Sequence, residues 1–217
     1  MTQAPDDDEQ EALSLSRVQD RWAGSRPALG LTWGMDLAGD NFVSKAASYG
    51  VFGPDRAVLE IGAGYGRLFD ATLRQQRPFK RYVAVDISEK NVRHLEERFA
   101  ADSLQVVHAA IETVSLDERF DSVVSSLTIK HLYPTFVPAL QNVERHLAPG
   151  AIVVFDLIEQ RVEGELQYVH SGTYVRRYTR SQVAELIPQA SLELVTLDHV
   201  VHEPGPKRLL VVARKPE

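Results

Sequence analysis

The chain has 217 residues, of which 44% are hydrophobic and 25% are charged, a composition typical of one soluble globular domain. It contains no cysteine, which excludes disulfide bonds, a thiolate nucleophile and any metal site built on thiolates. The formal net charge of -6 and the lack of a basic stripe argue against nucleic acid as a partner. The strongest apolar run, Ala151–Ile158, is interrupted by Asp156 and is far shorter than a membrane span, so no membrane partner is expected.

The first 55 residues precede the alternating pattern of the core. Residues 1–10 are acidic where a secretory signal would be basic, which predicts a solvated, flexible tail and a cytoplasmic protein. Within residues 11–55, helices are expected at Glu11–Ala23 and Asp40–Tyr49, with Asp40 as the N-cap of the second. The aromatic residues of this segment indicate either a lid or ordinary packing on the core.

From Arg56 onward, short apolar runs alternate with helical segments, which is the signature of βαβ units. The expected strands are Ala57–Ile61, Tyr82–Val85, Leu104–Val107, Ser122–Ser125 and Ile152–Phe155. The expected helices are Leu68–Gln75, Glu89–Ala100 with Ser88 as N-cap, and Thr135–Leu147 closed by Pro149 and Gly150, with a single turn around Ile111–Val114.

The C-terminal part departs from this alternation. Thr179 and Gln182 form a capping box for a helix to Ile187, and two apolar runs, Leu192–Val201 and Arg208–Ala213, flank a Pro-Gly-Pro turn. The pattern predicts an α/β fold. We expect a single Rossmann-like, doubly wound sheet that is mostly parallel and ends in an antiparallel hairpin, all within residues 56–217.

The most informative stretch is a strand followed at once by a glycine-rich turn that opens a helix. Gly62 and Gly64 permit backbone angles and a close ligand approach that a Cβ would forbid. The third glycine is Gly66, and Arg67 stands where a dinucleotide fingerprint has its last glycine. A pyrophosphate site is therefore disfavoured.

Two acids narrow the ligand class. Asp86 ends the second strand, where a carboxylate accepts hydrogen bonds from both hydroxyls of a ribose without phosphate. Glu60 stands beside the turn, where it suits a cationic ligand group. S-adenosylmethionine offers such a cation together with an unphosphorylated ribose, whereas dinucleotides offer no such cation.

Four blocks, in this order, resemble the class I S-adenosylmethionine-dependent methyltransferases: Glu60–Gly66, Val83–Asp86, Phe120–Leu127 and Leu147–Gly150. The resemblance implies the seven-stranded methyltransferase fold, an insert at about residues 159–178 that walls the substrate, S-adenosylmethionine as cofactor and S-adenosylhomocysteine as product. It also implies cofactor-binding residues: Glu60, Gly62, Ala63 and Gly64 for the methionine part, Asp86 for the ribose and Ile87 for one face of the adenine.

One position departs from the family pattern. The family often has an aspartate after the third strand for the adenine amino group, and here that position is Ala110. The backbone of Ile111 and the side chain of Glu112 are the remaining candidates, and a solvated acid is the alternative for Glu112. Arg67 suits either the cofactor carboxylate or a surface ion pair, and Ser126, after the fourth strand, completes the candidate cofactor residues.

Methyl transfer needs few catalytic groups, and the carboxyl end of the fourth strand is the place to find them. His131 lies there and is the candidate general base, the alternative being that it caps the next segment or packs on Tyr133. His170 is a second candidate in the insert, and Arg176 and Arg177 suit either an anionic substrate or surface ion pairs.

The predicted function is metal-independent methyl transfer to an oxygen or nitrogen atom of a small molecule. The fourth strand is followed by hydroxyls and no carboxylate that would hold Mg²⁺, and by no Asn/Asp-Pro-Pro-Tyr/Phe motif of amino-methylating nucleic-acid enzymes. A protein methyltransferase and a non-catalytic S-adenosylmethionine-binding subunit are the alternatives. The sequence identifies neither the acceptor nor the oligomeric state.

Overall fold

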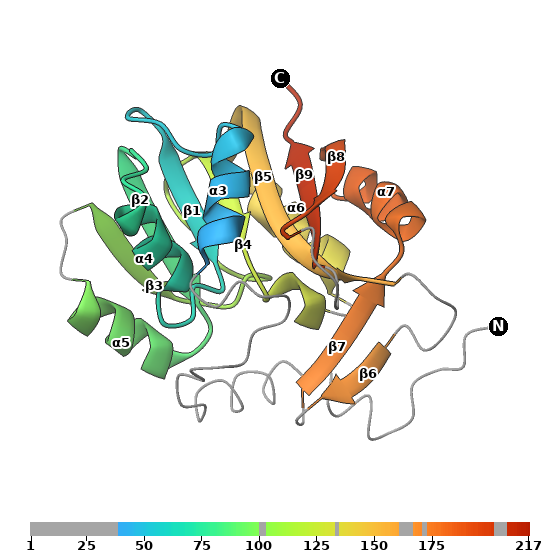
Figure 1. Cartoon of the computed structure of the whole chain (residues 1–217), viewed down its shortest axis with the longest axis horizontal. Coiled ribbons are helices and arrows are strands. Elements are labelled where there is room, and N and C mark those ends of the chain that lie inside the picture. Colours follow the sequence, from blue (N-terminus) through green and yellow to red (C-terminus); the bar gives the residue numbers. More distant parts are fainter. Residues whose placement is uncertain (1–38, 100–102, 133–134, 161–166, 171–172, 202–207) are drawn as a thin grey trace.

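The computed structural model describes residues 39–99, 103–132, 135–160, 167–170, 173–201 and 208–217 (Figure 1). Its helices are α3 Asp40–Ser48, α4 Arg67–Arg74, α5 Glu89–Arg98, the 3-10 turn η1 Ile129–His131, α6 Phe136–Arg145 and α7 Arg180–Gln189. Its strands are β1 Ala57–Ile61, β2 Arg81–Asp86, β3 Leu104–His108, β4 Phe120–Ser125, β5 Leu147–Glu159, β6 Gln167–His170, β7 Thr173–Tyr178, β8 Glu193–His199 and β9 Arg208–Arg214.

The strands build one twisted sheet. Its central strands run β3-β2-β1-β4-β5 and are parallel, and β9 and β8 continue it beyond β5 as an antiparallel pair. The predicted mostly parallel sheet with a C-terminal antiparallel hairpin is confirmed. The β6–β7 hairpin is attached to these seven strands through β7, which pairs with Ile158 and Glu159 of β5 beyond the point where β4 ends. The hairpin extends away from the rest of the sheet (Figure 1).

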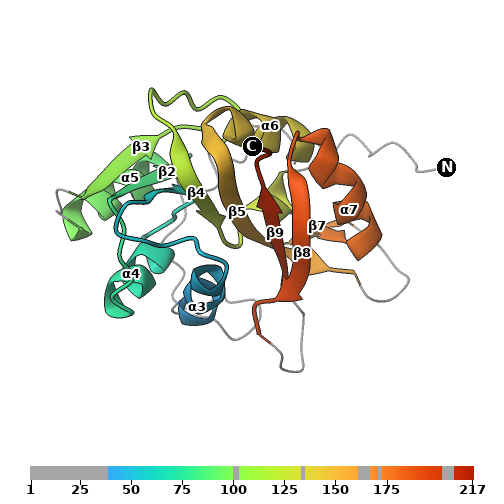
Figure 2. The same cartoon turned by 90° about the horizontal axis from the view of Figure 1, so that it is seen from above.

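Helices cover both faces of the sheet, as Figure 2 shows for α3 and α4 on one side and α6 and α7 on the other. Alternate residues of each strand point to opposite faces, so Val58 belongs to the cluster that includes side chains of α3 and α4, and Leu59 belongs to the cluster that includes side chains of α6 and α7. Phe42 of α3 is fully buried in the first of these clusters. Packing is therefore the role of this aromatic residue of the N-terminal segment, and the expected helix Glu11–Ala23 lies outside the described residues.

Two of the three predicted helix N-caps are confirmed. The hydroxyl of Ser88 accepts a hydrogen bond from the Asn91 backbone at the start of α5, and Thr179 and Gln182 form the predicted capping box of α7. The N-cap prediction for Asp40 is wrong, because Gly39 occupies that position in a left-handed conformation. Asp40 is the first helical residue, and its carboxylate instead pairs with Arg74 of α4.

The predicted end of α6 is also wrong. The helix ends at Arg145, and β5 begins at Leu147, so that Pro149 and Gly150 lie inside the strand instead of after the helix. The pairing with β4 jumps from Leu147 to Ile152 at this point, which marks an irregularity, and the Gly150 N–H bonds to the Lys215 carbonyl. Pro and Gly are tolerated in a strand where the ladder is interrupted in this way.

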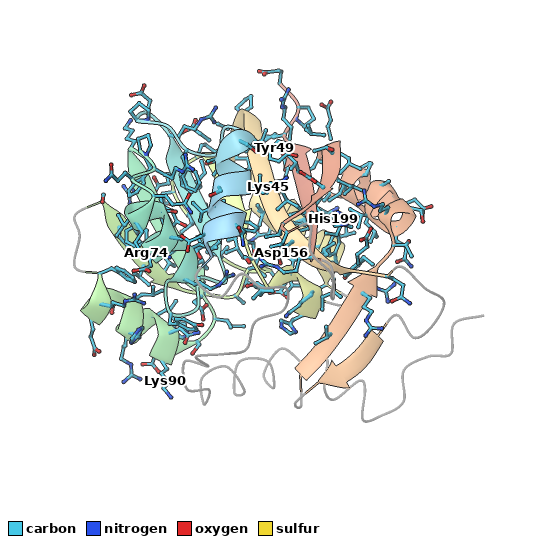
Figure 3. The ribbon with its side chains drawn as sticks, viewed as in Figure 1. Lys45, Tyr49, Arg74, Lys90, Asp156 and His199 are labelled. Atoms are coloured by element: carbon cyan, nitrogen blue, oxygen red, sulfur yellow. The ribbon has the colours of Figure 1, made fainter. Side chains whose placement is uncertain are left out.

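Polar contacts join helix α3 to β8, the strand at one end of the sheet. Lys45 donates to the Asp198 carboxylate of β8 at 2.8 Å, and the Tyr49 hydroxyl donates to the same oxygen at 3.1 Å (Figure 3). Burial would raise the pKa of the Asp198 carboxyl, but Lys45, the His199 backbone N–H and Tyr49 together hold it at about 2. Among the described residues, the helices are all too short or too polar to span a bilayer.

The packing of Gly66 generates a stability prediction. A Cβ at this residue would overlap Leu95 of α5 and the ring of Phe99, the C-cap residue of that helix, and its φ of 88° is unfavourable for other residues. We expect Gly66→Ala to lower the free energy of unfolding by about 2–5 kcal/mol, combining overpacking with left-handed strain.

Gly50 supplies the matched control, because it has a φ of 79° but nothing within 4 Å of the added methyl group. Gly50→Ala should lose only the strain contribution of about 1–2 kcal/mol. Urea denaturation of both variants measures the difference, and equal losses would refute the packing argument.

Candidate active site

The glycine-rich turn lies at the carboxyl end of β1 and is held from several sides. The N–H groups of Gly62 and Ala63 both donate to the Val85 carbonyl of β2, at 2.8 and 3.1 Å. A Cβ at Gly62 would overlap the Thr128 side chain, whereas a Cβ at Gly64 would meet nothing within 4 Å. Gly62 is therefore required for packing, and Gly64 is the turn residue that borders open space.

Asp86 fixes this turn from the end of β2. One carboxylate oxygen accepts from the Gly64 N–H at 2.7 Å, and the other accepts from the Ser88 N–H at 2.9 Å and the Asn91 amide at 3.1 Å. Burial raises the pKa of Asp86 above its ordinary value, and these three hydrogen bonds oppose that rise. The structure thus brings Asp86 and the turn together, as the sequence predicts.

Glu60 lies next to the turn but deeper in the fold. It is 2% exposed and accepts a hydrogen bond of 2.7 Å from the hydroxyl of Tyr82. Burial raises the pKa of Glu60 to about 8, although Tyr82 and the charge of Arg67 act in the opposite direction. The carboxyl is therefore mainly protonated at neutral pH in the structure as it stands.

Arg67, the first residue of α4, points across the top of β1 toward β4. Its guanidinium donates to the Ser126 hydroxyl at 2.5 Å, and Arg208, the first residue of β9, donates to the same oxygen at 2.7 Å. Ser126 in turn donates to the Asp156 carboxylate at 2.7 Å. The two predicted residues Arg67 and Ser126 thus meet in a polar cluster at the carboxyl edge of the sheet.

Asp156 is the anionic centre of this cluster (Figure 3). It forms a buried ion pair with Arg208 and accepts the Leu127 N–H at 2.8 Å. Burial by itself would raise its pKa, but the charge and hydrogen bonds of Arg208, with those of Leu127 and Ser126, hold the pKa of Asp156 below its ordinary value. Asp156 is therefore ionised.

Lys130 of η1 lies within electrostatic range of Asp156, Arg208 and Arg67. It is 5% exposed, and burial lowers its pKa to about 8; Asp156 opposes this shift, while the charges of Arg208 and Arg67 add to it. Fully buried lysines are rare because desolvation of an ammonium group is unfavourable. A buried lysine in this position indicates either a buried ion-pair network or a functional group.

Asp156, Arg208 and Lys130 are not among the site residues that the sequence predicts. The detectable signal was charge inside apolar runs, since Asp156 interrupts Ala151–Ile158 and Arg208 opens the run of β9. Buried strands contain charged residues only when these have partners, so two such charges on neighbouring strands indicate a pair. Lys130 had no comparable pattern around it.

The expected adenine side is built by the segments after β2 and β3. Ile87 is half-buried, and Ile111 is buried in a turn closed by the Val114 N–H bonding to the Ala110 carbonyl. Glu112 accepts a hydrogen bond of 2.8 Å from the hydroxyl of Thr135, so it is neither free nor fully solvated. The single turn predicted around Ile111–Val114 is confirmed.

His131 is half-buried at the end of η1, a segment that packs against β5 and β7. On β7, Tyr178 is buried with its ring 5.2 Å from that of Phe136, which makes this aromatic residue part of the core. The guanidinium of Arg176 lies 5.3 Å from the centre of the Tyr178 ring. The side chain of the second candidate, His170, lies outside the described part of the structure.

Metal-binding clusters of three or more His, Asp or Glu side chains are not found among the described residues. A pocket of about 470 Å³ is present, but it is lined by residues 113–119, which lead into β4, and by Asn142, Arg145 and His146 around the end of α6. It therefore lies at the amino edge of the parallel strands, opposite the glycine turn.

A family model described as a methyltransferase domain matches residues 59–153, which include the glycine turn, Asp86 and Ser126. This chain contains a methyltransferase domain. Together with the fold, the match confirms the resemblance to the class I S-adenosylmethionine-dependent methyltransferases.

Curated relatives of this methyltransferase domain match over part of their length. An uncharacterized methyltransferase of Mycobacterium tuberculosis is 35% identical over 104 residues, 46% of this chain and 51% of the relative. A probable phthiotriol/phenolphthiotriol dimycocerosates methyltransferase 2 of Mycobacterium ulcerans is 26% identical over 100 residues, 46% of this chain and 38% of the relative. The chain thus spans about half, or less, of the curated relatives it matches.

One solved structure is similar in fold across the whole chain. The 1,6-didemethyltoxoflavin-N1-methyltransferase of Burkholderia thailandensis, solved with 1,6-didemethyltoxoflavin and S-adenosylhomocysteine, has a TM-score of 0.78 at 21% identity. The likeness covers 100% of this chain and 94% of that enzyme. The β6–β7 hairpin and the β8–β9 pair therefore fall within the part of the chain that this solved methyltransferase matches.

The protonated state of Glu60 in this methyltransferase domain generates a pH prediction. Its pKa is raised from 4.5 to about 8, so between these values the folded chain holds a proton that the unfolded chain releases. The free energy of unfolding should therefore fall as the pH rises through this window, with a slope of up to about 1.4 kcal/mol per pH unit from this group.

Glu60→Gln should remove this contribution, because the amide resembles the protonated carboxyl and does not titrate. Urea denaturation between pH 5 and pH 8 measures it, with Glu96→Gln on the exposed side of α5 as control. If wild type and Glu60→Gln had the same pH dependence, the assignment of a raised pKa to Glu60 would be wrong.

Proposed function

We propose that this chain is an S-adenosylmethionine-dependent methyltransferase that transfers the methyl group to an oxygen or nitrogen atom of a small molecule without a metal ion. The observation that carries the proposal is the open position at Gly64 beside the buried carboxylate of Asp86. A ligand that lies on this turn meets bare backbone on one side and an acid on the other.

The residues present fit this cofactor. A ribose placed on the turn has the Asp86 carboxylate as acceptor for its hydroxyls. Glu60 lies on the neighbouring strand, where ionisation of its carboxyl offers a counter-charge to an amino group. Arg67 would lie near the methionine part, and Ile87, Ile111 and Glu112 would line the adenine side.

S-adenosylmethionine supplies an already activated methyl group on a sulfonium, which the acceptor displaces in line. The chain's own residues then have to align the acceptor, exclude water and remove a proton where the acceptor carries one. His131 is placed on η1, directly after β4, and is the candidate that takes this proton at a ring nitrogen.

Two observations favour a small acceptor over a protein. One neighbour that matches across the whole chain is a methyltransferase solved with the small molecule 1,6-didemethyltoxoflavin. The β6–β7 hairpin pairs with the end of β5 and contacts η1, so it covers part of the sheet edge where a protein acceptor would need a groove. Turnover of a small-molecule panel in the presence of EDTA tests the proposal, and binding of S-adenosylmethionine without any turnover would favour the non-catalytic alternative.

The role of Asp86 generates a binding prediction. Asp86→Ala should weaken S-adenosylmethionine binding by about 1–3 kcal/mol, because two ribose hydroxyls lose a charged acceptor. Asp55→Ala, an exposed acid before β1 at the opposite edge, is the control. Calorimetry should also detect no binding of NAD. Unchanged affinity in Asp86→Ala would rule out the ribose assignment.

The role of His131 generates a kinetic prediction. His131→Gln should lower kcat by roughly 10²- to 10⁴-fold with little change in cofactor affinity, the usual effect of losing a positioned base. The acid limb of the pH–rate profile should disappear in this variant. His94→Gln on α5 is the control. A loss below about tenfold would instead indicate that alignment alone drives the reaction.

A further inference from the structure

Leu127, which follows β4, has a left-handed backbone conformation that residues with a side chain rarely adopt. Its φ is 64°, and among the described residues the other non-glycine members of this region are Gln76 at 52° and Ser191 at 58°. Gln76 and Ser191 directly follow the C-caps of α4 and α7. Their N–H groups bond to the carbonyls of Leu73 and Pro188, which is a common way to end a helix. Leu127 follows a strand instead, so helix termination does not explain its conformation.

Hydrogen bonds on both sides hold this strained residue in place. The Leu127 N–H donates to one oxygen of the Asp156 carboxylate at 2.8 Å, and the Ser126 hydroxyl donates to the other oxygen at 2.7 Å. The Thr128 hydroxyl donates to the Gly62 carbonyl at 3.2 Å, and a Cβ at Gly62 would overlap the threonine. Leu127 therefore lies between β5 and the glycine turn. Strained residues persist where the surrounding structure fixes them, and such residues cluster at functional sites.

The side chain of Leu127 takes no part in the core that the described residues form. It is half-buried and belongs to none of their hydrophobic clusters. Other half-buried leucines, such as Leu116 and Leu132, pack against the cluster that contains Leu59. In the described part of the chain, the other half-buried Leu, Ile or Val outside the clusters is Ile87, the candidate for one face of the adenine. Leu127 thus shares its exposure, and its place at the carboxyl edge of the sheet, with a candidate ligand-binding residue.

The position of Leu127 indicates which ligand its side chain meets. Asp86 and the glycine turn occupy the β1–β2 part of the carboxyl edge, and β4 lies on the other side of β1. A cofactor with its ribose at Asp86 and its methionine part on the turn has its sulfonium end toward β4. Leu127 comes directly after β4, beside the turn at Gly62, so a methyl acceptor has to approach the sulfonium next to this side chain.

We propose that Leu127 is a specificity-determining residue of the acceptor site, and that the acceptor has an apolar face next to the atom that receives the methyl group. The inference rests on the proposed function, because it requires the cofactor to lie on the glycine turn. Contact between the leucine and an apolar face removes apolar surface of both partners from water. The acceptor is thus a small molecule that combines a hydroxyl or amino group with an aromatic or alkyl face.

The test measures the binding of two probes to the full chain saturated with S-adenosylhomocysteine. The probe 2-naphthol joins a hydroxyl to a planar apolar face, whereas ethanolamine has a hydroxyl and an amino group without such a face. Leu127→Asn makes the side chain polar and keeps a residue that tolerates the left-handed region, and Leu127→Met restores an apolar side chain. Leu73→Asn, at an exposed position near the end of α4, is the matched control. Calorimetry gives the dissociation constants.

We expect 2-naphthol to bind the wild type, Leu127→Met and Leu73→Asn with comparable affinity, and ethanolamine to show no saturable binding. Leu127→Asn should bind 2-naphthol about tenfold or more weakly, because an apolar contact is replaced by an amide that has to lose water. Affinity for S-adenosylhomocysteine should be the same in all four proteins. Equal 2-naphthol binding in Leu127→Asn and the wild type, or no saturable binding to the wild type, would overturn the proposal.

Glycine variants separate this role from a structural one. Leu127→Gly, Gln76→Gly and Ser191→Gly each relieve a residue held in the left-handed region. We expect none of the three to lower the urea midpoint, and only Leu127→Gly to weaken 2-naphthol binding, by about tenfold or more. A lower midpoint in Leu127→Gly together with unchanged 2-naphthol affinity would show that the side chain serves packing, and the proposal would then be wrong.

The cofactor itself is the alternative ligand for Leu127. If Leu127→Asn weakened S-adenosylhomocysteine binding and left 2-naphthol binding unchanged, the side chain would belong to the cofactor site, which also contradicts the proposal. A wild-type chain that fails to bind S-adenosylhomocysteine would instead contradict the proposed function. The same 2-naphthol titrations without the cofactor would then still decide the role of Leu127, since its hydrogen bond to Asp156 lies within the chain.

Discussion

The hydrogen bond between the Gly64 N–H and the Asp86 carboxylate is the contact on which the rest of the site depends. It ties the turn after β1 to the end of β2, and the Val85 carbonyl holds the same turn through two further N–H groups. Behind the turn, Gly66 packs against Leu95 and Phe99 without room for a side chain. These contacts fix the conformation of the turn, and they thereby fix the direction in which α4 begins.

The start of α4 determines where Arg67 lies. Because this residue follows Gly66 directly, its guanidinium crosses the end of β1 and reaches Ser126 after β4. A single side chain thus joins the β1–β2 side of the edge to the β4–β5–β9 side. Any change in the turn would displace Arg67 and disturb the cluster around Asp156.

The two buried acids beside Arg67 differ in state because their donors differ. Glu60 has a neutral phenol as its hydrogen-bond donor, and this donor together with the charge of Arg67 does not offset burial, so its proton is retained at neutral pH. Asp156 has a guanidinium, a hydroxyl and a backbone N–H, which together outweigh burial. The fold therefore keeps Asp156 ionised at the cluster and suppresses the charge of Glu60.

Features that depend on residues close together in the sequence could be predicted from it. The Ser88 cap, the capping box of Thr179 and the glycine turn are examples, because each is a local hydrogen-bonding or steric requirement. The end of α6 could not be predicted, because Pro149 and Gly150 are tolerated in β5 only through an irregular pairing with β4. There, tertiary pairing overrides the helix-terminating preference of Pro and Gly.

The cluster around Asp156 could not be predicted for a different reason. Its members come from α4, the end of β4, η1, β5 and β9, and Ser126 and Arg208 are separated by 82 residues. Only the topology brings them together, since β9 runs antiparallel to β5 and so places its first residue at the edge where the parallel strands end. The reversed strand thereby contributes a buried arginine at a position that a parallel strand would reach with its last residue.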